Sequence, residues 1–170
     1  MRWLAFVTLL LTAGCDLLDK AAMQAAGWET ITLSAQPFEL NPKGRTFTAK
    51  DQLIARGESN VCVVLKEHYP MVAQAQMDRD FTSLLHGATI SATVMAVNGK
   101  EYQLTGVGQA WALHGDVTSS EEFSACVSCG CQSEIPDGTV IRSVHIESDK
   151  PLHVLGAYWQ SMPKNDGPKG

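Results

Sequence analysis

The sequence lacks clusters of basic residues, and its charge balance is mildly acidic. It contains 13 Lys and Arg against 18 Asp and Glu, which gives a formal net charge of −5. Nucleic acids and anionic lipid surfaces attract proteins through runs or patches of Lys and Arg. Without such a run, we expect no nucleic acid partner and no polybasic attachment to a membrane.

The short motifs of several enzyme classes are missing as well. The sequence has no H-E-x-x-H metalloprotease motif, no G-x-S-x-G nucleophile elbow and no G-x-G-x-x-G dinucleotide fingerprint. We therefore expect no enzymatic activity, no cofactor and no metal. A Ser-His-Asp triad stays open at this point, because its members are identified by geometry and not by their order in the chain.

The first residues have the layout of a secretory signal. Arg2 is the only charge before Asp16, an apolar stretch follows from Trp3 to Leu11, and small residues then precede Cys15. A positive start, a short apolar region and a small-residue cleavage site are typical of such signals. The apolar stretch is shorter than the roughly 20 residues that span a membrane.

The segment Leu11-Thr12-Ala13-Gly14-Cys15 resembles the lipobox of bacterial lipoproteins, although Thr12 stands where Leu is commoner. The resemblance implies that Cys15 is diacylated and becomes the first mature residue, which would attach the protein to a membrane facing the periplasm. Asp16 resembles the residue that retains such lipoproteins in the inner membrane, so we favour that membrane over the outer one.

The chain divides into four parts on this interpretation. Residues 1–14 form the signal peptide, 15–27 the lipidated cysteine and its tether, 28–161 a single β-rich domain and 162–170 a flexible tail. As a helix the tether would span roughly 18 Å, and fully extended about 40 Å. The domain is therefore expected close to the membrane.

Alternating apolar residues and frequent turns predict many short strands between residues 28 and 161. Asn98-Gly99, flanked by two such strands, is the favoured pair for a tight β-hairpin. Residues 70–86 have the periodicity of one helix, and Ser119 with Glu122 forms a capping-box pattern for a short helical turn. We predict an antiparallel β-sandwich of immunoglobulin-like architecture with one helix and a disulfide-rich loop, with a small β-barrel as the alternative.

Four cysteines remain besides Cys15, and an even number in an oxidising compartment favours disulfides. They are Cys62, Cys126, Cys129 and Cys131. We favour one bridge from Cys62 to a member of the C-x-x-C-x-C cluster and a second bridge inside the cluster, from Cys126 to Cys129 or to Cys131. The alternative is a thiol-redox site or a site for a soft metal, Cu(I) or Zn(II), at residues 126–131.

Three aromatic residues are candidate contacts for a protein partner: Trp111, Tyr158 and Trp159. Adjacent residues of one strand point to opposite faces, so only one of Tyr158 and Trp159 is expected in the core. The sequence thus predicts a lipid-anchored, non-catalytic module that recognises another envelope protein, of the inhibitor or immunity type or as an accessory part of an envelope complex. A thiol-redox or soft-metal-binding lipoprotein is the alternative.

Overall fold

A computed structural model describes residues 29–70, 85, 87–116, 119–129 and 134–162. The described residues contain eleven β-strands and no helix. The expected signal peptide, the tether and most of the expected helix at residues 70–86 lie outside them. The bounds of the strands are β1 (Glu29–Ser34), β2 (Phe38–Leu40), β3 (Arg45–Ile54), β4 (Glu58–Pro70), β5 (Ile90–Ala96), β6 (Glu101–Leu104), β7 (Gly106–Asp116), β8 (Ser119–Ser128), β9 (Val140–Ser148), β10 (Leu152–Val154) and β11 (Gly156–Met162).

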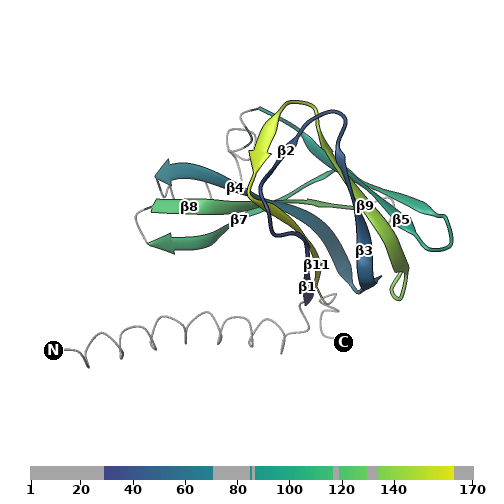
Figure 1. The fold of residues 1–170 in the computed structure, drawn as a ribbon. Helices are drawn as coiled ribbons and strands as arrows, with labels where there is room; N and C mark the ends of the chain where they lie inside the picture. Colours follow the sequence, from purple (N-terminus) through teal and green to yellow (C-terminus); the bar gives the residue numbers. More distant parts are fainter. Residues whose placement is uncertain (1–28, 71–84, 86, 117–118, 130–133, 163–170) are drawn as a thin grey trace, which may run out of the picture.

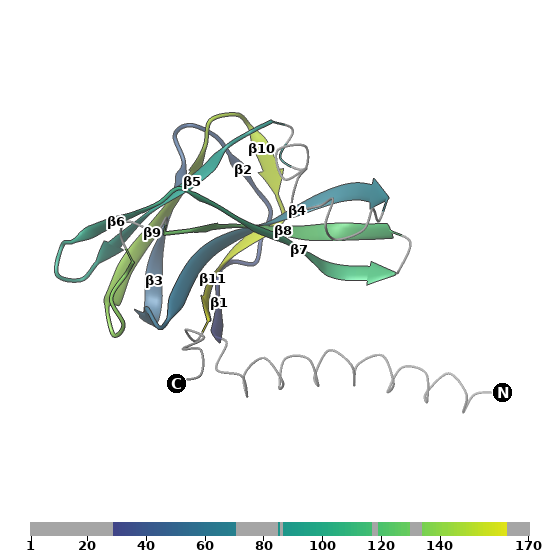
Figure 2. The ribbon, with the colours of Figure 1, turned by 180° about the vertical axis from the view of Figure 1, so that it is seen from behind.

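The strands form three sheets in which all neighbours are antiparallel (Figures 1 and 2). One sheet has five strands in the order β1-β11-β4-β8-β7, and a second has four in the order β3-β9-β5-β6. Strands β10 and β2 form a small third sheet. Both larger sheets have open edges, so the β-barrel alternative is wrong and the fold is a mainly β, antiparallel sandwich.

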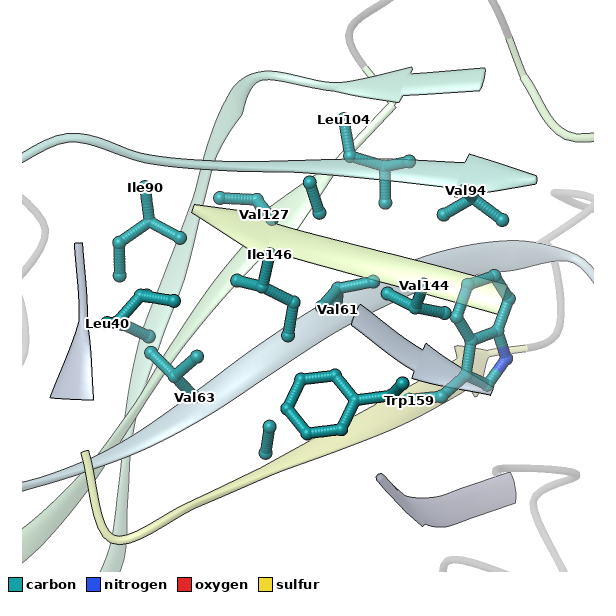
Figure 3. Close-up of a cluster of buried hydrophobic side chains, with 14 of the residues drawn as sticks. Leu40, Val61, Val63, Ile90, Val94, Leu104, Val127, Val144, Ile146 and Trp159 are labelled. Carbon is teal, nitrogen blue, oxygen red and sulfur yellow. The ribbon is translucent and has the colours of Figure 1, made fainter. Parts of the chain in front are cut away.

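The apolar core lies between the two larger sheets. In β5 every second residue is buried, which turns Ile90 and Val94 toward the core and leaves their neighbours half-exposed. Val63 and Trp159 come from the five-stranded sheet, and Figure 3 shows their side chains in one cluster with those of the four-stranded sheet. This alternation is what two sheets packed face to face require of their strands.

A hairpin at Asn98-Gly99 is confirmed, but its loop is one residue longer than the predicted two-residue turn. The Ala96 N–H donates to the Lys100 carbonyl at 2.9 Å and the Gly99 N–H to the Ala96 carbonyl at 3.0 Å, so the loop is Val97, Asn98 and Gly99. Gly99 has a φ of +83°, which a side chain would strain. The second strand of this hairpin, β6, is short. The chain leaves the four-stranded sheet after Leu104 and enters the five-stranded sheet as β7.

The capping-box prediction at Ser119 and Glu122 is also wrong, because both residues belong to strand β8. Ser119 is in register with Pro70 on β4 and with Asp116 on β7, so β8 has a partner strand on each side. Pairing along two neighbours outweighs the local preference of one Ser and one Glu for a helix start. Pro70 itself is the last residue of β4, and not the first of a helix.

Candidate functional site

One disulfide joins the middle of two neighbouring strands. Cys62 on β4 lies directly opposite Cys126 on β8, and their sulfur atoms are bonded at 2.02 Å. Both residues are buried. The predicted bridge from Cys62 to a member of the cysteine cluster is therefore confirmed. It closes a loop with a sequence separation of 64 residues.

The predicted second bridge, from Cys126 to Cys129 or Cys131, is wrong because Cys126 is bonded to Cys62. Cys129 is a free thiol, half-buried and packed against the core, and Cys131 lies outside the described residues. Cys129 is three residues after Cys126, and three residues of extended chain separate two Cα atoms by about 10 Å. A disulfide needs its two Cα atoms within about 7 Å. An odd separation also turns the two side chains to opposite faces of the strand.

The environment of the Cys129 thiol lowers its reactivity. Burial raises its pKa, the nearby Glu134 carboxylate raises it further, and a backbone hydrogen bond with Ile135 only partly offsets these effects. The thiolate is the form that attacks disulfides and binds metals. At neutral pH the Cys129 side chain is thus in its weakly reactive form. Among the described residues, no group of three or more His, Cys, Asp and Glu side chains is arranged to hold a metal ion.

The three candidate aromatic residues have different positions in the sheets. Trp159 has no exposed surface, and its indole N–H donates to the Ser161 hydroxyl at 2.9 Å inside the core. Its inclusion among the partner contacts is therefore corrected: Trp159 is a core residue. Trp111 lies on β7 in register with Ser124, and the structure describes its backbone only.

Tyr158 points to the other side of β11, onto the outer face of the five-stranded sheet. It is half-buried and lies in one row with Thr32 of β1 and Cys62 of β4. Burial raises the pKa of its phenol, and the nearby Ser124 hydroxyl partly offsets the shift. The phenol therefore stays neutral at physiological pH and keeps its hydroxyl as a hydrogen-bonding group.

Two buried amides lie beside Tyr158 on the same face of the sheet, and the sequence analysis missed both. Asn60 of β4 and Gln160 of β11 face each other in register and are only 5% and 8% exposed. Both belong to strands that pair along the five-stranded sheet, and β4 starts at Glu58, directly after the Arg56-Gly57 turn.

A second polar group lies on the outer face of the four-stranded sheet. The Nδ1 atom of His145 is 2.9 Å from the Thr46 hydroxyl, and its Nε2 atom is 3.8 Å from the Glu147 carboxylate. The Ser91 hydroxyl donates to the same carboxylate at 3.1 Å. The order hydroxyl, imidazole, carboxylate is that of a catalytic triad. However, the carboxylate is beyond hydrogen-bonding distance of the ring, and the hydroxyl is exposed.

Gly44 holds the His145 ring from the side. Its φ is +64°, and a Cβ atom added there would collide with the His145 imidazole and with the Ile146 carbonyl. The ring therefore packs against the backbone just before the start of β3. Together with the hydrogen bond to Thr46, it gives this histidine a structural role.

No protein-family model, curated protein or solved structure matches this chain. In the part of the chain that the structure describes, no helix has the length and apolar character needed to cross a membrane.

Proposed function

We propose that this protein is a lipid-anchored recognition module of the bacterial cell envelope, attached through Cys15 and facing the periplasm. It binds another envelope or secreted protein, as an inhibitor or immunity protein or as an accessory part of an envelope complex. Asp16 favours the inner membrane. The lipobox resemblance supports the location, and the surface around Tyr158 supports the binding role.

The observation that carries the proposal is the position of Tyr158. It is a half-buried aromatic side chain on the outer face of a five-stranded sheet, next to the buried amides of Asn60 and Gln160. Tyr is enriched among the residues that contribute most to protein interfaces, because it combines a large apolar ring with a hydroxyl.

The strand beneath Tyr158 is well fixed. The Cys62–Cys126 disulfide is in the same row of the sheet, and β11 is paired on both sides, with β1 and with β4. On the opposite face, the neighbouring Trp159 is fully buried in the core. A side chain held on a rigid element loses little conformational freedom when it binds a partner.

The proposal is tested by placing a photo-crosslinking amino acid at position 158 of the full-length protein in its native cells. The matched control position is Thr93, a half-exposed residue on the outer face of the other sheet. We expect one discrete protein adduct from position 158 and none from position 93. Mass spectrometry of the adduct identifies the partner, which is then purified.

The affinity for that partner is measured for the wild type and for Tyr158→Ala, Tyr158→Phe and Thr93→Ala. Loss of an anchoring aromatic residue costs roughly 2 kcal/mol or more, so Tyr158→Ala should weaken binding by more than about tenfold. Tyr158→Phe should retain most of the affinity and Thr93→Ala all of it. The same adducts from both positions, or none from position 158, would refute the proposal.

A further inference from the structure

One end of the sandwich contains both the start of the domain and two exposed valines. Val97 and Val140 are 62% and 37% exposed, and they are the large exposed hydrophobic residues among those described. They are neighbours, since the Val97 N–H donates to the Val140 carbonyl at 2.9 Å. Single exposed valines are ordinary on a protein surface, so their importance depends on their neighbourhood.

The start of β1 contacts the turn between β3 and β4. Glu29, the first residue of β1, pairs in register with Ser161 of β11, and its carboxylate lies 3.8 Å from the Arg56 guanidinium. Arg56 belongs to the turn between β3 and β4. Figure 1 shows the start of β1, the end of β3 and the loop before β9 along the lower side of the molecule.

Hydrogen bonds join the turn at Arg56 to the segment that precedes Val140. The Ala55 N–H donates to the Thr139 carbonyl at 2.9 Å, and the Gly57 N–H donates to the Asp137 carboxylate at 2.8 Å. Hydrogen bonds and an ion pair thus lead step by step from the first residue of β1 to the two valines. We call this end, formed by Glu29, residues 55–57, residues 137–140 and Val97, the tether end.

We propose that the tether end contacts the lipid surface, with Val97 and Val140 in the interfacial layer of the bilayer. The inference rests on the proposed lipid anchor at Cys15, which leaves only residues 16–28 between the acylated residue and β1. A tether this short holds the domain within about 40 Å of the bilayer even when fully extended. The tether thus gives the domain a high effective concentration at the bilayer surface. At such a concentration, a small apolar contact between the domain and the lipid is enough to set the orientation of the domain.

The charges at this end favour an apolar contact over an electrostatic one. Arg56 and Lys100 are exposed there, and so are Glu58 and Asp137, while Glu29 is half-exposed. The two signs offset each other, so no excess of positive charge selects anionic lipids. The contact should therefore form on neutral phosphatidylcholine vesicles as well as on anionic ones. With the tether end on the membrane, β9 extends away from it for about 27 Å.

The test uses the full-length protein, purified in detergent with its acyl chains and reconstituted into phosphatidylcholine vesicles that contain a nitroxide-labelled lipid as quencher. A fluorescent amino acid replaces Val97, or Lys43 as the control. Lys43 is exposed in the turn between β2 and β3, and the neighbouring Asn41 accepts a hydrogen bond from Ser148 at the far end of β9. We expect strong quenching at position 97 and none at position 43.

A second variant tests whether the contact is apolar. Val140→Asp in the protein labelled at position 97 should restore the fluorescence, because a charge beside the probe opposes its burial in lipid. Pro42→Asp, which also replaces an exposed apolar residue but at the far end, should leave the quenching unchanged. Thermal unfolding of both variants confirms that the fold is retained.

The remaining outcomes separate this inference from the proposed function. Equal quenching at positions 97 and 43, or none at either, in protein that floats with the vesicles would overturn the lipid contact and leave the anchor standing. Protein that does not float and whose intact mass lacks acyl chains would overturn the anchor, and the lipid contact with it.

Discussion

The outer faces of the two larger sheets are held together in different ways. On the five-stranded sheet a buried disulfide joins β4 to β8. On the four-stranded sheet the strands are linked on the outside by side-chain contacts, an exposed one from Thr46 to His145 and a half-buried one from Ser91 to Glu147. A covalent link restricts the unfolded chain, whereas an exposed hydrogen bond replaces one that water already provides. We therefore expect the first face to contribute far more to stability than the second.

The strongest test of this comparison is to remove the disulfide. In the chain-entropy model a bridge that closes a loop with a sequence separation of 64 residues contributes about 4 kcal/mol. The double substitution Cys62→Ala with Cys126→Ala should lower the free energy of unfolding by roughly 2–5 kcal/mol, as measured by urea denaturation. Cys129→Ser, which removes a free thiol, is the control and should cost much less. A loss as small as that of the control would mean that the bridge does not stabilise this face.

The four-stranded face has one position where a large effect is expected, and it depends on backbone geometry. Gly44→Ala places a methyl group against the His145 ring and the Ile146 carbonyl at a φ of +64°. We expect a loss of roughly 1–3 kcal/mol in the free energy of unfolding, measured by the same denaturation experiment.

The variant His145→Ala separates the two causes. By itself it removes an exposed hydrogen bond to Thr46 and a 3.8 Å contact with the Glu147 carboxylate, and it should cost under about 1 kcal/mol. Combined with Gly44→Ala it should relieve the contact with the ring but not the strain in φ. The double variant should therefore lose less stability than the sum of the two single variants. Strict additivity would show that the ring does not restrict Gly44.

The smallest expected effect concerns the titration of Tyr158. Its pKa is raised in the folded state, so the folded protein holds this proton more tightly than the unfolded chain does. The resulting stability is present below the ordinary tyrosine pKa of about 10 and is lost as the pH rises through the folded value. Tyr158→Phe should thus lose less stability than the wild type above about pH 10, in thermal unfolding followed across pH. Parallel curves for the two proteins would contradict the assigned shift.

The sequence predicted the parts of the fold that depend on local pattern. In residues 140–148 the apolar Val144 and Ile146 alternate with polar neighbours such as His145, and the structure buries both apolar residues and leaves His145 half-exposed. The β5–β6 hairpin was predicted for the same kind of reason, since Gly99 adopts a positive φ that few other residues tolerate, although the loop is one residue longer than expected. The mainly β, antiparallel class followed from these elements together.

The errors concern choices that local pattern leaves open. Ser119 and Glu122 suit a helix start. They belong to β8 instead because β8 pairs with β4, which is distant in sequence, and with β7. Tyr158 and Trp159 had to point in opposite directions, but which of them is buried depends on the side of β11 that faces the second sheet. The buried amides of Asn60 and Gln160 were missed because their meeting requires the register of two strands about 100 residues apart.

The sequence by itself determined where strands alternate and where a hairpin falls, and it favoured a bridge from Cys62 to the distant cysteine cluster. Only the tertiary structure decided that Cys126 is the partner, that Tyr158 and not Trp159 keeps exposed surface, and that the Arg56 turn links the first residue of β1 to the segment of Val140 and Val97. The physical reason is that alternation and turn geometry act between residues close in the chain. Strand register and the packing of one sheet on another are long-range, and they are fixed only when the whole core assembles.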